Sequence, residues 1–559
     1  MDFKQIGAAA ASESGYLNDG DWLKLYIGAL ADNLTAASVF SRFQAELDQR
    51  NVKADVIATG SFGYYDLEPL VLVEKPGKPA ILYPNVTAEA AAELVDDYLV
   101  NDNPRPDMAL CSMDDDEIDG IPSVSALPLF NLQNRIALRN CGYIDPENIN
   151  HYILHGPGYG GLNRALSMGQ SAVIEEIKKS GVRGRGGAGY PAAEKWKSCH
   201  DAGGSPKWVI CNAVDTDPRA LTTRLILEGD PHSVLEGMLI GAYAVGASRC
   251  VICANADYSA ATKRLDKALV QMRGYGLLGD NILGSTFSCE IEIREVPASL
   301  VAGEETALIR YLEGKQAMPY VRPPYPVVGG LYGEPTLINN LETMADVSAI
   351  LQNGAEWYAT FGTGQSRGAK VITLAGDVVH KYTVEVPFGT TLNNVINAVG
   401  GGVGNGKKIK AVQFGGPTGA YFNADSLDIH LDYETVREAG SIIGSGTVEV
   451  FGSDTCAVEM TRDVISYLQT QSCGKCVFCR EGSHQMSDIL QDIAEGKGEP
   501  RDLELLTELG EAMKIGCICS LGRTASNPVL SSMRLFDSDY SAHIRGKKCP
   551  SNGQSSAVD

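Results

Sequence analysis

The spacing of apolar residues along the first hundred positions predicts a small unit of mixed helices and strands. The elements predicted from this pattern are a helix over residues 23–47, strands over 54–58 and 70–73, and a further helix over 88–99. Together they predict an α+β unit over residues 1–110. The polar, proline-containing run at 101–106 disrupts regular structure, and we place the first boundary there.

The pattern changes twice in the rest of the chain. Helices alternate with short apolar strands from 125 to 365, strands dominate between 366 and 450, and residues 451–550 are helical. The predicted strands are 208–211 and 250–253 in the first of these stretches, and 370–374, 382–386 and 411–414 in the second. Since a chain of 559 residues is too long for one core, we predict an α/β multidomain protein with four units.

Composition and charge exclude several classes of protein. The 14 cysteines are dispersed apart from one segment, and the chain begins without an apolar stretch typical of a signal peptide, so we expect a reducing, cytoplasmic setting. No window approaches 18 consecutive apolar residues, which argues against a transmembrane helix. The net charge of -22 makes nucleic acid a poor partner, because phosphate backbones require basic patches.

One cysteine motif predicts a metal cluster. Cys473, Cys476 and Cys479 are each separated by two residues, and Cys519 follows about one helical hairpin later. A zinc site or a disulfide framework would also use cysteines, but structural zinc sites usually take paired Cys-x2-Cys knuckles. A run of three crowds three thiolates around one corner of an iron-sulfur cube. The motif therefore favours a [4Fe-4S] cluster, an electron carrier, with Cys517 as the rival of Cys519 for the fourth place.

A glycine-rich loop predicts a phosphate-bearing cofactor. The run Arg-Gly-Arg-Gly-Gly-Ala-Gly-Tyr at 183–190 matches the dinucleotide fingerprint G-x-G-x-x-G. The fingerprint requires a strand before it, whereas the amphipathic segment 171–179 predicts a helix, so this is not an ordinary Rossmann loop. A tight turn is the alternative. The glycines would let backbone amides approach a phosphate, and the arginines and Lys195 would add counter-charge.

Two further motifs combine polar residues with the ends of predicted elements. Glu304 and Glu305 follow Gly303 at a predicted helix start, and Asn339 and Asn340 follow a short strand-like run. Either motif could be a helix cap or a turn rather than part of a binding site.

Taken together, and in their order along the chain, the motifs described above resemble those of the NADH-oxidising flavoprotein subunit (51 kDa type) of respiratory complex I. They also resemble those of its relatives in NAD-dependent formate dehydrogenases and multimeric [FeFe]-hydrogenases. The motifs are Arg-Gly-Arg-Gly-Gly-Ala-Gly at 183–189, Gly-Glu-Glu-Thr at 303–306, Ile-Asn-Asn-Leu-Glu-Thr at 338–343 and Ser-Cys-Gly-Lys-Cys at 472–476. The resemblance extends from about residue 130 to 545. The stretch 135–146 is most similar to the soluble, hydrogenase-associated branch, some of whose members bifurcate electrons.

The resemblance implies a fold and a set of cofactor residues. It implies a thioredoxin-like domain over 1–110, a Rossmann-like FMN and NAD domain over 125–365, a ubiquitin-like β-grasp (SLBB-type) domain over 366–450 and a helical [4Fe-4S] bundle over 451–550. The implied cofactor-binding residues are Gly184, Arg185, Gly186, Gly187, Lys195, Asn212, Asp215, Gly303, Glu304, Asn339 and Asn340. The implied residues of the NAD(P)H site are Glu305, Tyr190 and Asp217. The family motif Cys-x-Leu-Gly at 519–522 identifies Cys519 as the fourth cluster ligand.

The implied function is electron transfer between NAD(P)H and a partner redox subunit. A hydride delivers two electrons together and a cluster accepts one, whereas a flavin exchanges either number. The implied partners are redox subunits of a hetero-oligomeric complex, including a thioredoxin-like [2Fe-2S] subunit. Formate, hydrogen, ferredoxin and acyl-CoA reductase partners are all compatible with the sequence.

The chain departs from the family at two sites. Ser61 and Tyr65 stand where relatives carry cysteine ligands of an N-terminal [2Fe-2S] cluster, so we expect that domain to have kept its fold and lost its cluster. Relatives read Asn-Ala-Asp-Glu-x-Glu-Pro-Gly where 212–219 reads Asn-Ala-Val-Asp-Thr-Asp-Pro-Arg, and Tyr190 and Ser198 replace aromatic Phe residues. These changes favour an alternative, a scaffold or electron-relay subunit whose nucleotide site has decayed.

A second metal site is implied near the C-terminus. Cys456, His543 and Cys549 match part of a zinc site that hydrogenase-type relatives carry. The next cysteine position of that family pattern is Gln554 here.

Overall fold

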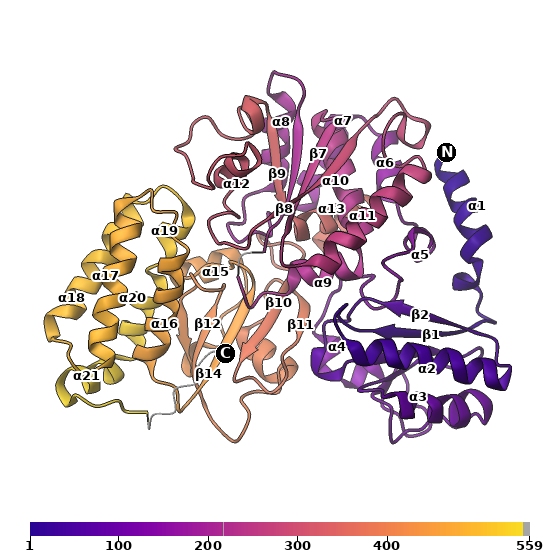
Figure 1. The fold of residues 1–559 in the computed structure, drawn as a ribbon, viewed down its shortest axis with the longest axis horizontal. Coiled ribbons are helices and arrows are strands. Elements are labelled where there is room, and N and C mark those ends of the chain that lie inside the picture. The colour runs from indigo at the N-terminus through magenta and orange to yellow at the C-terminus, as the bar shows by residue number, and fades with distance from the viewer. Residues whose placement is uncertain (216, 552–559) are drawn as a thin grey trace.

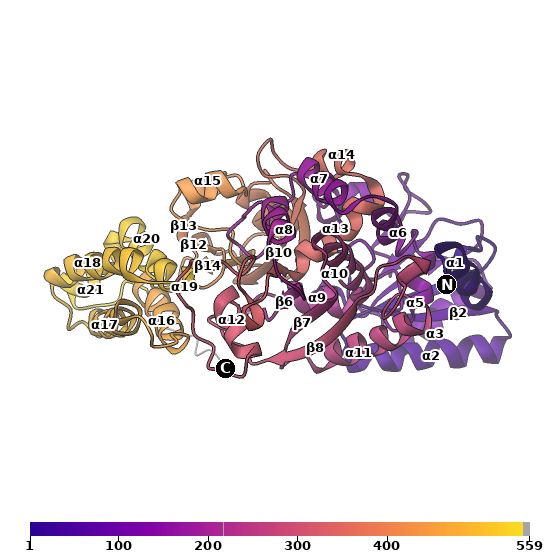
Figure 2. The same cartoon turned by 90° about the horizontal axis from the view of Figure 1, so that it is seen from above.

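Four units follow one another along the chain in the computed structural model, which describes residues 1–215 and 217–551 (Figure 1). Three of them are built on β-sheets, which we call the first, central and third sheets, and the last is the C-terminal bundle of helices. The bundle forms one end of an elongated molecule and the first sheet the other (Figure 2). Gln554 lies outside the described residues.

The first sheet has the strand order β2-β1-β3-β4-β5, with β1 parallel to β2 and antiparallel to β3. Its elements are β1 (Leu23–Gly28), α2 (Leu34–Arg50), β2 (Ala54–Thr59), β3 (Leu70–Glu74), β4 (Ile81–Tyr83), α3 (Ala88–Leu94), the π-helical turn Val95–Val100 and β5 (Cys111–Ser112). The predicted strands at 54–58 and 70–73 and the helix at 88–99 are confirmed. Because β5 pairs with β4, the sheet continues just past residue 110.

The predicted helix over 23–47 is wrong in its first part. Leu23–Gly28 is the buried strand β1, and the helix begins only at Leu34, where the Asn33 side chain accepts a hydrogen bond from the Ala36 amide. One face of β1 packs into the core of the first unit and Tyr26 packs into a core shared with the third sheet. A strand that is covered on both faces loses the apolar–polar alternation that would identify it in a sequence.

The central sheet is parallel, with the order β8-β7-β6-β9. Its strands are β6 (Trp208–Ala213), β7 (Arg249–Asn255), β8 (Glu290–Val296) and β9 (Thr336–Asn340). The helices of this unit are α5 (Ile149–Leu154), α6 (Gly160–Ser167), α7 (Gln170–Ser180), α8 (Ala192–Asp201), α9 (Thr222–Gly229), α10 (Pro231–Val245), α11 (Ser259–Gly274), α12 (Glu305–Leu312), α13 (Leu341–Asn353) and α14 (Ala355–Ala359). These elements confirm the predicted strands at 208–211 and 250–253 and the helix at 171–179.

The strand order of the central sheet identifies where a ligand would bind. From β6 the chain adds β7 and β8 on one side, and then returns to place β9 on the other side of β6. In parallel α/β sheets, ligands bind outside the carboxyl ends of the strands where the order reverses. Asn212 and Asn340 pair across this point, close to the carboxyl ends of β6 and β9.

The third sheet is mixed, with the order β11-β10-β14-β12-β13. Its elements are β10 (Ala369–Gly376), β11 (Thr383–Pro387), β12 (Ile409–Phe414), β13 (Tyr421–Asn423), α15 (Tyr433–Glu438) and β14 (Thr447–Gly452).

The bundle contains α16 (Ala457–Thr470), α17 (Val477–Ala494), α18 (Pro500–Gly516), α19 (Ser520–Thr524), α20 (Asn527–Leu535) and α21 (Asp537–Gly546). Two short helices lie nearer the N-terminus, α1 (Phe3–Ser14) and α4 (Pro128–Asn131). The predicted strands at 370–374, 382–386 and 411–414 and the helical C-terminal segment are confirmed.

Buried charges join the central unit to the third sheet. Glu342 on α13 pairs with Lys370 on β10 and also accepts a hydrogen bond from the Val371 amide at 2.9 Å, and both charged side chains are almost fully buried. On β11, the buried Glu385 carboxylate accepts three backbone amides from residues 136–138 at 2.8–3.0 Å. Because each buried carboxylate has several partners, its desolvation is compensated only when the two units meet in this one arrangement.

Within residues 1–215 and 217–551, none of the helices combines the length and apolar character that crossing a bilayer requires.

We expect Lys370→Met to destabilise the protein, because it leaves the Glu342 carboxylate buried beside the Val371 amide without its cation. Removing one partner of a buried pair costs about 3 kcal/mol. The measurement is the melting temperature by calorimetry, which should fall clearly. The matched control is Lys497→Met, which breaks an exposed pair with Glu495 and should leave the melting temperature nearly unchanged. Equal melting temperatures for Lys370→Met and wild type would contradict the role of this pair.

Candidate functional site

Five cysteines line one cavity between the bundle and the central unit. They are the four predicted cluster ligands Cys473, Cys476, Cys479 and Cys519, together with Cys517. The other lining residues are Val301, Pro319, Lys475, Ile518 and Leu521. Cys476 caps the N-terminus of α17 and Cys519 that of α19. The structure therefore brings the four predicted ligands together, with Cys517 beside them.

A hydroxyl group and a backbone amide contact two of the thiols in this cavity. Ser472 Oγ lies 3.3 Å from Cys479 Sγ, and the Ile518 amide donates to Cys476 Sγ at 3.5 Å. The contact with Cys517, together with that of Ser472, lowers the pKa of the Cys479 thiol to about 6, although burial opposes the shift. A set of converging sulfur donors with backbone and hydroxyl donors around them fits a [4Fe-4S] cluster.

Lys475 connects the cysteine loop to the central unit. Its ammonium group donates to the Pro319 carbonyl at 2.6 Å. Pro319 and Val301 belong to the segments on either side of α12, which carries Glu305, and they form one wall of the cavity. The iron-sulfur site and the segment around Gly303 are therefore neighbours in space.

The glycine-rich loop lies between the central and third sheets. A Cβ atom at Gly186 would lie 3.5 Å from Asn340 Cβ, which places this part of the loop beside the carboxyl end of β9. Gly187 has a φ of 106°, and a Cβ there would come within 2.8 Å of Gly444 Cα in the third unit. Gly184 closes the loop by donating its amide to the Tyr190 carbonyl at 2.9 Å. The loop thus presents bare backbone at the switch point of the central sheet, as a phosphate site requires.

Charged side chains gather near β9, whose last residue Asn340 the loop approaches. Lys195 on α8 pairs with Glu305 and donates to the Ile338 carbonyl at 3.0 Å. Arg322 lies 3.9 Å from Glu304 and 3.8 Å from Glu305. These cations and acids, at the carboxyl edge of the sheet, provide groups that could bind an anionic cofactor and a nucleotide.

Several predicted binding residues also have structural roles. Asn212 donates to the Gly303 carbonyl at 2.8 Å and so joins β6 to the segment before α12. Glu304 caps α12 by accepting the Thr306 and Ala307 amides. Asn340 caps α13, and Asn339 accepts a hydrogen bond from the Trp196 indole at 3.1 Å. Glu304 and Asn340 therefore act as helix caps, which was the alternative to a binding role that their motifs allowed.

The side chain of Arg185 does not join this group. Its guanidinium is buried, lies 3.3 Å from Asp346 and donates to the Arg367 carbonyl at 2.9 Å. It also stacks over the Phe388 ring, with 4.7 Å between the guanidinium carbon and the ring centroid. We expected the Arg185 charge to face a cofactor, but the guanidinium points into the protein interior. It is held there by Asp346 and the Arg367 carbonyl, which are far from Arg185 in the sequence.

The predicted NAD(P)H residues differ in exposure. Tyr190 is 55% exposed beside the glycine loop. Asp217 is only 3% exposed and accepts hydrogen bonds from Ser445 Oγ at 2.6 Å and the Arg219 amide at 3.0 Å. Asp215 lies two residues before it and is partly buried, and desolvation and the Asp217 charge raise its pKa to about 7. The Asp217 carboxylate is therefore held by Ser445 of the third unit and by its own loop, and its place in the NAD(P)H site stays a prediction.

The positions of the missing [2Fe-2S] ligands are occupied by a hydrogen-bond network. Ser61 donates to Glu68 and accepts the Gly63 amide, and Tyr65 donates to Thr383 Oγ1 at 3.0 Å. Burial raises the pKa of Glu68 to about 7. The first cysteine of the chain is Cys111, so no thiolate is available from this loop.

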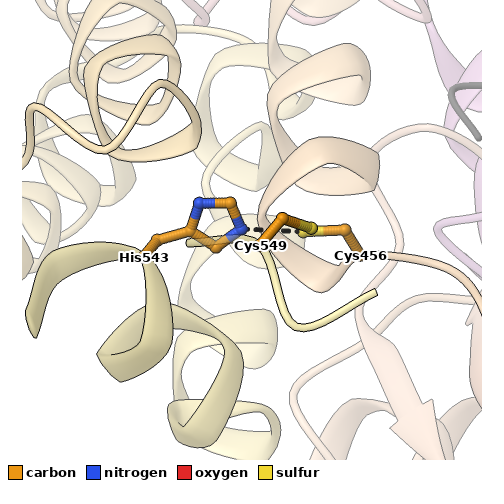
Figure 3. Close-up of side chains that lie close together, drawn as sticks. All are labelled: Cys456, His543 and Cys549. Carbon is orange, nitrogen blue, oxygen red and sulfur yellow. Dashed lines mark hydrogen bonds between the residues drawn. The ribbon is translucent and has the colours of Figure 1, made fainter. Parts of the chain in front are cut away.

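The candidate zinc ligands lie close together where the start of α16 meets α21 and the segment that follows it (Figure 3). The ligand atoms of Cys456, His543 and Cys549 all lie within 4.8 Å of one another, and Cys456 Sγ lies 3.2 Å from His543 Nε2. The other ring nitrogen of His543 faces the Ala494 carbonyl at 3.2 Å, which would orient the imidazole. Two thiols and an oriented imidazole match three of the four positions of a tetrahedral zinc site.

Some residues of the site carry no clear signal in the sequence. Val301 and Pro319 form a wall of the cysteine cavity, yet nothing in their local sequence indicates it. Arg322 is the one cation in the proline-rich run 319–326, and that isolation is the only sign in the sequence of its contact with Glu304 and Glu305.

These features together define a class of protein. A parallel sheet carries a glycine loop and cationic groups at its switch point, and it shares a wall with a cavity of five thiols. This combination is that of a flavin- and iron-sulfur-dependent electron-transfer protein.

Comparison with known proteins identifies the family. Residues 177–349 match the Nuo51 FMN-binding domain, and residues 459–543 match the NADH-ubiquinone oxidoreductase-F iron-sulfur binding region. The chain is 45% identical over 420 residues to the NADP-reducing hydrogenase subunit HndC of Solidesulfovibrio fructosivorans, an alignment that covers 75% of this chain and 85% of that protein. It is 36% identical over 416 residues to an NADH-quinone oxidoreductase subunit of Rhizobium meliloti (strain 1021), covering 74% and 99% of the two chains.

A solved structure agrees with this relationship. The crystal structure of an NAD+-reducing [NiFe]-hydrogenase in the H2-reduced state contains a chain that matches with a TM-score of 0.65 and 26% identity, over 96% of this chain and 87% of that one. The chain therefore belongs to the Nuo51 family of flavoproteins, oxidoreductases that carry FMN and a [4Fe-4S] cluster.

We expect Glu68→Gln to change the pH dependence of stability. The folded protein holds the Glu68 pKa at about 7, above its ordinary value of 4.5, so the protonated form is favoured on folding. This contribution is complete below about pH 4.5 and is lost as the pH rises through 7. The melting temperature of the variant relative to wild type should therefore rise between pH 5 and pH 8. A difference that does not vary with pH would contradict this, and Glu117→Gln, an exposed carboxyl of the same region, is the control.

Proposed function

We propose that this chain exchanges electrons between NAD(P)H and a partner redox subunit, through FMN at the switch point of the central sheet and a [4Fe-4S] cluster in the cysteine cavity. The observation that carries the proposal is the shared wall of that cavity. Val301 and Pro319, which line it, flank the Gly303–Glu305 segment beside the glycine loop. Two redox sites that share a wall form a direct path for electrons.

Different residues of the chain would bind the cofactor and the nucleotide. When bound, FMN supplies the conversion between the electron pair of a hydride and the single electrons that a cluster accepts. The bare backbone at Gly186 and Gly187 suits a phosphate, and Lys195 places a positive charge next to it. Asn212 fixes the Gly303 carbonyl, which holds the segment before α12 in place. Glu305 and the exposed Tyr190 are the residues that we assign to the nucleotide.

We assign fold types to the other units and a role to the assembly. The order and direction of strands support a thioredoxin-like first unit without its cluster and a ubiquitin-like β-grasp third unit. The partners are redox subunits of a larger complex, including a separate thioredoxin-like [2Fe-2S] subunit. No disulfide joins any of the 14 cysteines, which fits a reducing cytoplasm.

A second candidate function is a scaffold or relay subunit whose nucleotide site has decayed. The loop after β6 favours it, because Asp217 bonds to Ser445 and the Arg219 guanidinium pairs with Glu449 at 2.9 Å. Both contacts hold the loop after β6 against the third unit. Val214 is fully buried where relatives carry a carboxylate. These residues are then no longer available to a nucleotide.

The proposed function is tested with protein reconstituted with iron, sulfide and FMN. We expect wild type to bind FMN and to reduce a viologen dye with NADH or NADPH. Lys195→Met should lower the flavin content several-fold, because it removes the cation beside the glycine loop. Lys197→Met is the matched control, since Lys197 is exposed and pairs only with Asp201 on the same helix.

The two candidate functions give different results in this assay. Flavin bound without dye reduction by either nucleotide would contradict electron exchange with NAD(P)H. An intact cluster signal without flavin absorbance would support the scaffold or relay subunit.

We also propose that Cys456, His543 and Cys549 bind zinc. Elemental analysis of wild type should give about one zinc per chain, and Cys549→Ala should lose most of it, because a site with two remaining protein ligands binds zinc weakly. Cys111→Ala, a buried cysteine of the first sheet, is the control and should keep the zinc. Equal zinc content in wild type and Cys549→Ala would contradict the assignment.

A further inference from the structure

We propose that three exposed apolar residues of the bundle, Val477, Phe478 and Ile515, form the docking surface for the partner that exchanges electrons with the cluster. We call these three residues the bundle patch. The partner that fits it is a small, acidic protein or domain that carries one electron at a time. The inference rests on the proposed function, because it requires the [4Fe-4S] cluster.

The bundle patch is formed where α17 begins and α18 ends. Val477 is 59% exposed, Phe478 50% and Ile515 85%. Gly516 follows Ile515 in the last turn of α18, and a Cβ atom at Gly516 would overlap the Phe478 ring, so the two helix ends touch. Large apolar side chains that are grouped and exposed to water are typical of protein–protein interaction sites.

The bundle patch adjoins the cysteine cavity on its exposed side. Val477 and Phe478 lie between Cys476 and Cys479 in the chain, and Ile515 lies two residues before Cys517. All three of these cysteines line the cavity. A protein bound to the patch would therefore contact the two loops that hold the cavity cysteines.

The cysteines differ in their access to solvent. Cys473, Cys476 and Cys479 are partly exposed, whereas Cys517 and Cys519 are buried. Another wall of the cavity is closed by the central unit, where the proposed flavin site is the neighbour. A cluster in this cavity thus comes nearest to solvent at the three motif cysteines, beside the patch. Electrons could enter from the central unit and leave across the patch, or pass in the opposite direction.

The charges around the patch are opposite in sign to the net charge of the chain. Segments 472–483 and 511–524, which carry the patch and all the cavity cysteines, contain four cationic and two acidic residues, whereas the whole chain has a net charge of -22. Glu481 and Glu511 are the acidic residues, and they pair with two of the cations. All four cations are at least partly exposed: Lys475, Arg480, Lys514 and Arg523.

This arrangement defines the chemistry of the partner. An apolar patch flanked by an excess of cations is complementary to an apolar surface with an acidic rim, and the opposite charges steer the two proteins together. A [4Fe-4S] cluster exchanges single electrons, so the partner must carry a one-electron centre. The bundle forms one end of the molecule, opposite the first sheet, so the other sheet at the far end does not obstruct a docked protein (Figure 2).

The test uses the full-length protein, reconstituted with iron, sulfide and FMN, and an acidic [2Fe-2S] ferredoxin as the probe. Reduced ferredoxin is mixed anaerobically with the oxidised protein. Stopped-flow absorbance then gives the second-order rate constant for the transfer of one electron from the ferredoxin to the [4Fe-4S] cluster. We expect this rate constant to fall as the ionic strength rises, because salt screens the attraction between opposite charges.

Two substitutions at one position separate charge from folding defects. Ile515→Asp should lower the rate constant about ten-fold, because it places a charge that repels an acidic partner in the patch. Ile515→Lys should recover most of this loss, since it restores attraction at the same position. Leu34→Asp is the matched control and should equal wild type, because Leu34 is 87% exposed on the first unit. Iron content and the cluster signal produced by dithionite should be the same in all four proteins.

Several results would overturn the inference and leave the proposed function intact. These are a rate constant unchanged in Ile515→Asp, an equal loss in Leu34→Asp, a rate constant that rises with ionic strength, and no transfer from ferredoxin to wild type whose cluster dithionite reduces. An Ile515→Lys variant as slow as Ile515→Asp would overturn the acidic partner. Absence of a [4Fe-4S] signal from reconstituted, dithionite-treated wild type would overturn both this inference and the proposed function.

Discussion

The cysteine cavity is completed only where the C-terminal bundle meets the central unit. The bundle supplies five thiols, and the central unit supplies Val301 and Pro319 as the facing wall. The hydrogen bond from Lys475 to the Pro319 carbonyl ties the cysteine loop to that wall. The same stretch of chain carries Gly303 and Glu305, so one contact between two units sets the distance between the cysteine cavity and the proposed flavin site. Electron transfer requires that this contact hold its geometry.

The rest of the molecule supplies the rigidity that this contact needs. The pair Glu342–Lys370 and the stacking of the buried Arg185 guanidinium on Phe388 fasten the central unit to the third sheet, which in turn carries the bundle. Burying a charge without its partner costs free energy. These charges therefore disfavour any other arrangement of the units, and this effect is larger than their net contribution to the stability of the native arrangement. The same principle explains the altered loop after β6. Asp217 and Arg219 are drawn to Ser445 and Glu449, which strengthens the junction but removes both side chains from the edge where a nucleotide would lie.

Local patterns predicted much of the fold and the cysteines that line one cavity, and they failed where contacts between residues distant in the sequence decide the structure. Strands such as 208–211 and 370–374 are short apolar runs between polar turns, and the cysteine spacing is itself the arrangement around a cluster. The strand Leu23–Gly28 was mistaken for helix, because neighbours on both faces erase its alternation. Arg185 sits in a glycine loop, and only the fold reveals that Asp346, some 160 residues later, holds its guanidinium inside. The wall formed by Val301 and Pro319 is likewise a product of packing between units, which no local pattern records.

The central claim is that electrons from a nicotinamide nucleotide reach the [4Fe-4S] cluster across this shared wall. The most direct measurement is electron paramagnetic resonance of the anaerobic, flavin- and iron-loaded protein, frozen after addition of NADH or NADPH. We expect at least one nucleotide to produce the signal of the reduced cluster that dithionite also produces. A dithionite signal that neither nucleotide can generate, in protein with bound flavin, would contradict it.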